Sequence, residues 1–288
     1  MCDELTEGDL DRAGLPVTRR GFAGLVAVGG AAFATAACAQ GAGDKGRMVT
    51  IATPDGEADA YFTYPASGKH PAVLIWPDIR GLRPAFRQMA DRLAGDGYAA
   101  LVINPFYRDA KGEVVKPEDD WTQPAIRERL FGYAAKLTRD AAGRDAAAVA
   151  AWLDTQKMVD NGRGLGVTGY CLGGPLTIFS AVAVPERYLA CASFHGSRLS
   201  NDAPDSPHRG IALTKAQYLF ALAENDDARD PAEKDRLRAA LAGRGGFNEV
   251  EVYAGAQHGW CPPDGRAYNE AAAEKAWGRM LALFRAAL

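Results

Sequence analysis

The chain of 288 residues has no excess of basic residues, because 33 Lys and Arg stand against 36 Asp and Glu, for a formal net charge of −3. Nucleic-acid-binding proteins normally carry a basic surface, so we expect no nucleic-acid partner. Cysteines are few, and none lies in a CxxC pair or a Cys/His cluster of zinc type (Cys2, Cys38, Cys171, Cys191, Cys261). We therefore expect no structural metal.

A long, strongly apolar run is also missing. The weakly apolar stretch near the amino terminus contains four glycines and is marginal as a membrane span. It follows Arg19 and Arg20, with Phe22 two residues later, and ends in the small-residue sequence Ala37-Cys38-Ala39. This pattern resembles a twin-arginine export signal, with a surface helix or a short membrane anchor as the alternatives.

The signal divides the chain into three parts. We expect residues 1–39 to be a signal peptide recognised by the export machinery, residues 40–46 a linker and residues 47–288 the folded domain, exported to the periplasm. A lipid anchor at Cys38 fits less well, because Thr35 stands where an aliphatic residue is usual. Cleavage would leave three cysteines, so at least one thiol would be free or paired between chains.

Short apolar runs alternate with helical patterns in the rest of the chain. After a hairpin pattern in residues 48–66, runs typical of strands occupy residues 72–76, 98–105, 164–170, 188–194, 216–223 and 248–254. Helical patterns occupy residues 84–94, 144–156, 176–183, 232–242 and 269–287. This alternation predicts an α/β fold with a mostly parallel sheet covered on both faces.

Two segments interrupt this alternation. Residues 109–143 combine a polar loop with a helical stretch, and we interpret them as an insertion near the mouth of a site. Residues 198–211 form a polar, proline-containing loop. In such sheets the chemistry gathers at the carboxyl ends of the strands, where loops of this kind lie.

The stretch GVTGYCLGGPLTIF places Cys171 where a predicted strand becomes a predicted helix. Gly169 and Gly173 flank it in a G-x-C-x-G pattern, the G-x-S-x-G elbow with cysteine in place of serine. Such a turn projects its side chain above the sheet, next to the N–H groups of a helix start that stabilise a thiolate and an oxyanion. A buried structural cysteine is the alternative interpretation.

An acid and a histidine follow in the order of an α/β-hydrolase triad. Asp226 lies in the turn after the strand at 216–223, although Glu224, Asp227 and Asp230 share that acidic turn. His258 lies on the loop after the next strand. The remaining histidines are weaker candidates for the base (His70, His195, His208).

With these motifs the chain resembles the dienelactone hydrolase family of α/β-hydrolases over residues 47–288. GYCLGG resembles the nucleophile motif, ALAENDDARDP the acid loop, and YAGAQHGW the histidine motif, with Trp260 for the usual Phe. The resemblance implies that Cys171 attacks an ester or lactone carbonyl, His258 transfers protons and Asp226 orients the imidazole. It also implies an oxyanion hole made by the backbone N–H groups of Ile79 and Leu172.

The same resemblance suggests substrate contacts. Asp78 stands where the family has a glutamate that interacts with the cysteine, and the stretch NPFYRDA resembles one that supplies an arginine to a substrate carboxylate. A second family arginine, past the histidine, is missing here, which argues against dienelactone itself as the natural substrate. The predicted substrate-binding residues are Asp78, Arg80, Phe106, Tyr107, Arg108, His195 and Trp260.

The sequence thus predicts a cofactor-independent hydrolase of carboxylic esters or lactones that forms an acyl-cysteine. A non-catalytic binding module on a degenerate hydrolase fold is one alternative, favoured by the shorter Asp78. A thiol acyltransferase or redox protein is another, in which Cys261 would reach Cys171.

Overall fold

The computed structural model describes residues 46–116, 119 and 123–288, so the predicted signal peptide lies outside the described residues. One eight-stranded sheet has the order β1-β2-β4-β3-β5-β6-β7-β8. Strand β2 pairs antiparallel with both β1 and β4, and all other neighbouring strands pair parallel. The strands are β1 (Arg47–Thr53), β2 (Gly56–Thr63), β3 (Ala72–Trp76), β4 (Ala99–Ile103), β5 (Leu165–Tyr170), β6 (Tyr188–Phe194), β7 (Gln217–Ala223) and β8 (Asn248–Tyr253).

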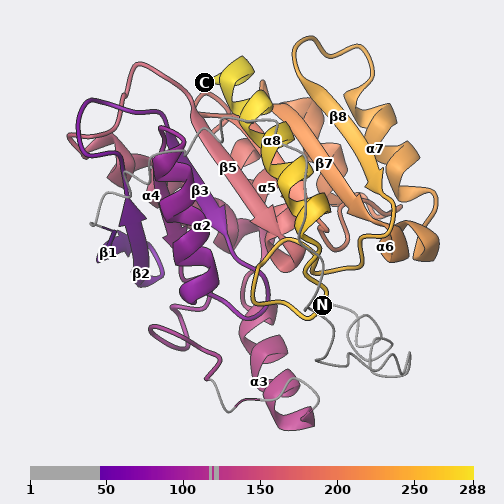
Figure 1. Ribbon diagram of the computed structural model, residues 1–288, viewed down its shortest axis with the longest axis horizontal. Helices are drawn as coiled ribbons and strands as arrows, with labels where there is room; N and C mark the ends of the chain where they lie inside the picture. Colours follow the sequence, from indigo (N-terminus) through magenta and orange to yellow (C-terminus); the bar gives the residue numbers. More distant parts are fainter. Residues whose placement is uncertain (1–45, 117–118, 120–122) are drawn as a thin grey trace, which may run out of the picture.

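Helices cover both faces of this sheet, as predicted. In Figure 1, α2 and α8 lie in front of the strands and α4 and α5 behind them, while α3 projects from the end of the molecule toward which β5 runs. The helices are α2 (Pro84–Gly95), α3 (Pro124–Ala135), α4 (Arg139–Asp154), α5 (Gly174–Ala183), α6 (Glu224–Arg229), α7 (Glu233–Leu241) and α8 (Glu270–Ala287), with short 3₁₀ turns η1 (Cys171–Gly173) and η2 (Pro207–Leu213). None of the helices in the described ranges is long and apolar enough to cross a bilayer.

Local sequence signals set where these helices begin. A proline occupies the first turn of α2, α3 and α5, where its missing N–H costs no hydrogen bond. The side-chain oxygens of Thr138 and Asn269 cap α4 and α8 by accepting from Ala141 N–H and Ala272 N–H. Because Thr138 caps it, α4 begins five residues before the predicted start, so the expected insertion at 109–143 includes the first turn of α4.

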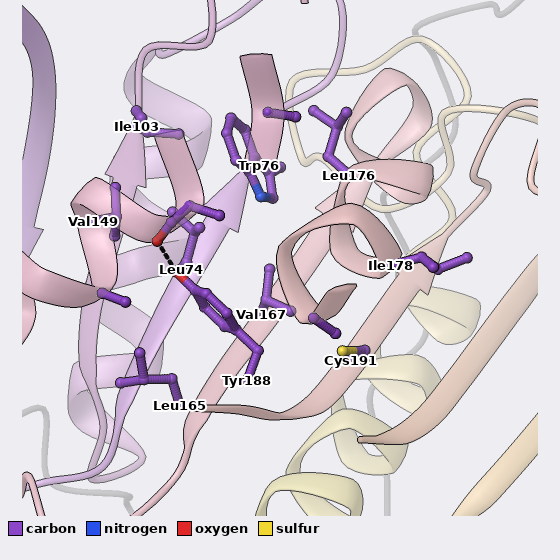
Figure 2. Packing of buried hydrophobic residues seen from close by; sticks show 14 of the residues in the cluster. Leu74, Trp76, Ile103, Val149, Leu165, Val167, Leu176, Ile178, Tyr188 and Cys191 are labelled. Atoms are coloured by element: carbon purple, nitrogen blue, oxygen red, sulfur yellow. Dashed lines mark hydrogen bonds between the residues drawn. The ribbon is translucent and has the colours of Figure 1, made fainter. Parts of the chain in front are cut away.

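The core consists of two apolar layers on opposite faces of the sheet. On the α4 and α5 side, Figure 2 shows Leu74 and Val167 of neighbouring strands packed with residues of both helices. Two buried polar groups in this layer find partners: the Trp76 Nε1–H donates to Ser180 Oγ at 3.0 Å, and the Tyr188 hydroxyl donates to the Ala146 carbonyl at 2.8 Å. Satisfying these groups removes the desolvation cost of burying them and fixes β3 against α5.

Candidate active site

Cys171 lies at the turn between β5 and α5, in the left-handed region of backbone space with φ +52°. This conformation costs a non-glycine residue about 1–2 kcal/mol. Residues with such strained backbone cluster at functional sites. The flanking glycines make the turn possible. A Cβ on Gly169 would lie 2.0 Å from the Gly173 carbonyl oxygen, and a Cβ on Gly173 would lie 2.4 Å from that of Trp76.

The same close approach brings the nucleophile turn against the loop after β3. Ile79 belongs to one small buried cluster with Cys171 and Phe106, and Leu172 packs against that cluster. The Ile79 loop and the start of α5 therefore meet beside the thiol. The family resemblance implies an oxyanion hole between the backbone N–H groups of Ile79 and Leu172, and this assignment stays a prediction.

His258 and Asp226 form the second part of the site. The His258 Nδ1 lies 2.6 Å from Asp226 Oδ2, and the His258 backbone N–H donates to Asn225 Oδ1 at 2.8 Å. Asp226 belongs to the first turn of α6, so the acidic turn predicted after β7 is the start of a short helix. Two residues of one short helix therefore hold His258: Asp226 binds its ring and Asn225 binds its backbone N–H.

The three acidic neighbours of Asp226 have other partners. Glu224 Oε2 accepts from the Gly255 N–H, and Asp227 pairs with Lys234 at 2.7 Å. Asp230 pairs with Arg236. The structure therefore selects Asp226 from the acidic cluster as the residue that meets His258.

The electrostatics of His258 connect it to the thiol. Burial lowers the pKa of the imidazole, but the negative charge of Cys171 and the hydrogen bond to Asp226 raise it well above its ordinary value of 6.5. The raised pKa favours the protonated form of the His258 imidazole. On its other side, the Cys171 Sγ lies 3.8 Å from Ser197 Oγ, a weak contact with a residue the sequence analysis did not select.

Asp78 is held by an arginine that the sequence analysis missed. Arg83 donates to both Asp78 oxygens at 2.7 and 2.9 Å, and to both Asp264 oxygens at 2.7 and 3.0 Å. Burial opposes the charge of Arg83, but the two carboxylates raise its pKa above the usual value. Arg83 immediately precedes Pro84, the first residue of the predicted helix, and no sequence motif pointed to it.

This network ties the Ile79 loop to the loop after His258. Asp264 belongs to the second loop, and Arg80 also approaches it, with Nη1 3.5 Å from Asp264 Oδ2. The Arg80 N–H donates to Asp78 Oδ1 at 2.9 Å. The loop after His258 lacks the second arginine that the family resemblance led us to expect. It supplies Asp264 instead, and Arg83 and Arg80 bind this acid.

Two predicted substrate contacts lie elsewhere. Arg108 donates to Asp145 and Asp55 at 2.7 and 2.6 Å, and the Tyr107 hydroxyl donates to Asp145 at 2.6 Å and contacts Thr53. These partners belong to α4 and to the β1–β2 hairpin. Carboxylates of the fold thus occupy the donors of both side chains, and the role of Arg108 and Tyr107 in substrate binding stays a prediction. Phe106, the preceding residue, does contact the cluster around Cys171.

Both His195 and Trp260 are completely buried, so neither can touch a substrate in this structure. Their rings pack behind the catalytic histidine candidate, with the His195 ring 5.1 Å from that of His258 and 6.0 Å from that of Trp260. Burial and the neighbouring His258 lower the pKa of His195 well below 6.5, so it stays neutral. His195 therefore packs against the His258 ring, and Trp260 packs behind His195.

The remaining cysteines are apart from the thiol at the elbow. Among the described residues, Cys171, Cys191 and Cys261 form no disulfide. Cys261 is buried in the apolar layer under α2 and α8, and burial raises its pKa well above the usual value for a thiol. Nothing in this arrangement favours the redox alternative, in which Cys261 would pair with Cys171. Within the described part of the chain no group of three or more His, Cys, Asp or Glu side chains could hold a metal ion.

A strained strand-to-helix turn at Cys171 on a mostly parallel eight-stranded sheet, with an acid after β7 and a histidine after β8, is the arrangement typical of an α/β-hydrolase. The chain belongs to the dienelactone hydrolase family, whose model matches residues 58–288. It is accordingly a hydrolase of this family, as the sequence motifs predicted.

Relatives and solved structures agree with this assignment. A Salmonella typhi protein with the provisional name carboxymethylenebutenolidase is 27% identical over 242 residues, covering 82% of this chain and 86% of that protein. The carboxymethylenebutenolidase of Pseudomonas sp. (strain P51) is 28% identical over 171 residues, covering 59% and 66%. A Klebsiella pneumoniae structure, provisionally identified as a dienelactone hydrolase, has a TM-score of 0.69 at 25% identity and covers 84% of this chain and 98% of its own.

Proposed function

We propose that this protein hydrolyses carboxylic esters or lactones through a Cys171-His258-Asp226 triad. The observation that carries the proposal is the position of His258. Its ring is hydrogen-bonded to Asp226 at 2.6 Å, and its pKa is raised by the charge of Cys171. A thiolate paired with an imidazolium is the activated form of a cysteine nucleophile.

The reaction then proceeds in two halves. The Cys171 thiolate attacks the carbonyl carbon, and the backbone N–H groups of Ile79 and Leu172 stabilise the oxyanion. The His258 imidazolium gives its proton to the leaving oxygen, and the C–O bond breaks to form an acyl-cysteine. Neutral His258 next takes a proton from water, which attacks the acyl carbon and releases the acid and the thiolate.

The relatives support this substrate class. The Pseudomonas relative is named for a lactone-opening activity, and a Bradyrhizobium relative that is 26% identical over 243 residues is named for a lactonase activity on an oxofuranylidene propanoate. A lactone and an ester present the same acyl carbon to the thiolate. The difference is that the leaving oxygen of a lactone stays attached to the acyl-enzyme.

The proposal is tested with short aryl esters and a dienelactone, with Cys171→Ala and His258→Ala beside wild type. We expect either substitution to abolish turnover while circular dichroism shows an intact fold. Cys261→Ala is the matched control, because it removes a thiol that lies in the apolar layer. Full activity in Cys171→Ala would exclude the acyl-cysteine mechanism.

We also propose that the protein is exported through the twin-arginine motif at Arg19 and Arg20. Replacing both arginines by lysine keeps the charge but removes the motif. Cell fractionation should then find wild type in the periplasm and the double variant in the cytoplasm. Equal distribution of the two proteins would contradict export by this route.

A further inference from the structure

The turn that follows β6 packs directly against the nucleophile turn. The Ser197 N–H donates to the Cys171 carbonyl at 3.1 Å, and the Ser197 Oγ lies 3.8 Å from the Cys171 Sγ. A sulfur acceptor is larger than an oxygen, and catalytic hydrogen bonds are often long before substrate binds, so this distance is compatible with a hydroxyl donor. Ser197 therefore contacts both the backbone and the reacting atom of the proposed nucleophile.

Two glycines allow this close approach. A Cβ on Gly174 would lie 2.4 Å from the Gly196 Cα, and a Cβ on Gly196 would lie 3.2 Å from the Gly174 Cα. A side chain at either position would push the two turns apart. The second glycine after Leu172 in the nucleophile motif therefore admits the turn that carries Ser197.

The backbone around Ser197 is strained. His195 and Arg198 lie in the left-handed region with φ +38° and +57°, as Cys171 does with φ +52°. In the described part of the chain these are the three residues other than glycine that have a positive φ, and all three belong to the two turns that meet at the thiol. Strained backbone of this kind clusters at functional sites, which indicates that the position of Ser197 serves the site.

Helix α7 fixes the far end of the same turn. The Ser200 N–H donates to Glu233 Oε1 at 2.9 Å, and the Arg236 Nε donates to Ser200 Oγ at 2.9 Å. The turn is thus bound at the Cys171 carbonyl and again at α7. Because the backbone of Ser197 is held in place, its hydroxyl needs only to rotate in order to donate to the sulfur.

The chemistry of the neighbouring groups assigns a role to this hydroxyl. Asp78, the acid that the family resemblance places near the cysteine, accepts from Arg83 at both of its oxygens. An ionised carboxylate only accepts hydrogen bonds, whereas a hydroxyl can donate one to a thiolate. A hydrogen bond to the charged form of a group favours that form. The Ser197 hydroxyl can therefore stabilise the Cys171 thiolate in addition to the charge of His258.

We propose that Ser197 is a further catalytic residue, whose hydroxyl donates a hydrogen bond to the Cys171 thiolate in the resting enzyme. This inference rests on the proposed function, because it adds a residue to the same site. The proton stays on the Ser197 oxygen while the thiolate attacks the carbonyl carbon. The hydrogen bond weakens when the sulfur loses its charge in the acyl-cysteine, and it forms again when hydrolysis releases the thiolate.

The first experiment does not depend on turnover. Alkylation of Cys171 in the full chain by iodoacetamide is followed over a pH series by peptide mass spectrometry, because its rate rises with the fraction of thiolate. Ser197→Ala should move the midpoint of this profile up by about one pH unit, the effect of one hydrogen bond to a charged group. The rate on the plateau above the midpoint should rise about threefold, since a less stabilised thiolate is more nucleophilic.

Two variants show whether the hydroxyl itself is responsible. Ser197→Thr keeps a hydroxyl and should restore at least half of the shift. Ser193→Ala is the matched control, because it removes a buried hydroxyl at the end of the same strand, where a Cβ on Gly196 would lie 2.4 Å from Ser193 Oγ. We expect the midpoint of the Ser193→Ala profile to equal that of wild type.

The second experiment measures kcat/KM for 4-nitrophenyl acetate over the same pH series. Below the wild-type midpoint, Ser197→Ala should lose about tenfold in kcat/KM, because a shift of one pH unit lowers the thiolate fraction by that factor. Above the midpoint of the variant, the two proteins should differ by no more than about threefold. A mere defect in folding would lower kcat/KM at every pH.

The outcomes separate this inference from the proposed function. If wild type hydrolyses no ester but Ser197→Ala still raises the alkylation midpoint, the proposed function fails and the hydrogen bond to the thiolate stands. If esters are hydrolysed and the midpoint of Ser197→Ala equals that of Ser193→Ala, the role of Ser197 is refuted and the hydrolase stands. A lower plateau with an unmoved midpoint would show that Ser197 only supports the turn, and would also refute its catalytic role.

Discussion

The buried arginine that joins the two active-site loops allows a sharp prediction. Arg83→Met removes a guanidinium that is 4% exposed and bound to two carboxylates. Methionine matches the apolar stem of the arginine but supplies no donor. The substitution therefore removes the charge network, together with the contact of the guanidinium with the Phe86 ring, whose centroid lies 4.8 Å from Arg83 Cζ.

The expected magnitude follows from the exposure of the two acids. The Asp78 side chain is 12% exposed and would lose its only ion-pair partner among the described residues, keeping the Arg80 N–H, whereas Asp264 is 35% exposed and can be hydrated. Removing one member of a buried ion pair costs about 3–5 kcal/mol of unfolding free energy, and nearly all of it should come from Asp78. Adding Asp78→Asn should recover about half of this cost, because an amide is cheaper to bury than an unpaired charge.

Urea denaturation at pH 7 measures both variants. The pH dependence provides a second measurement: burial favours the neutral acid, but Arg83 lowers the pKa of Asp264 in the folded state. A lowered folded pKa contributes stability that is present above the unfolded value of about 3.9 and is lost as the pH falls through the folded pKa. Arg83→Met should flatten this acid limb. A loss below about 1 kcal/mol, or a double variant no more stable than Arg83→Met, would refute the reasoning.

The remaining predictions concern the nucleophile turn and the triad. Gly173→Ala should cost at least 2 kcal/mol, on the order of an overpacked core, and most of the activity, because the new Cβ would lie 2.4 Å from the Trp76 carbonyl oxygen. Gly278→Ala in α8, where nothing lies within 4 Å, should instead raise the unfolding free energy by about 0.5–1 kcal/mol, and the same urea titration compares the two. Asp226→Asn should lower the pKa of His258, so that the imidazole loses its proton at lower pH, and reduce kcat by about three to four orders of magnitude. A pH–rate profile identical to that of wild type would contradict this role for Asp226.

The sequence by itself determined the architecture and the order of the site. Apolar runs of strand length alternate with helical patterns, and each predicted strand appears in the sheet within one or two residues of its expected bounds. The nucleophile motif was also readable, because only glycines permit the close backbone approaches around Cys171. These features depend on local periodicity and steric limits, which a sequence contains directly.

Tertiary structure alone decided which charged side chains meet. The sequence placed Arg108 at the substrate and overlooked Arg83, whereas the fold pairs Arg108 with Asp145 and joins Arg83 to Asp264, 181 residues away. It also decided that His195 supports His258 from a fully buried position. The physical reason is that a long charged side chain can reach several partners from one backbone position, and the choice among them depends on burial and on neighbours from distant strands and loops.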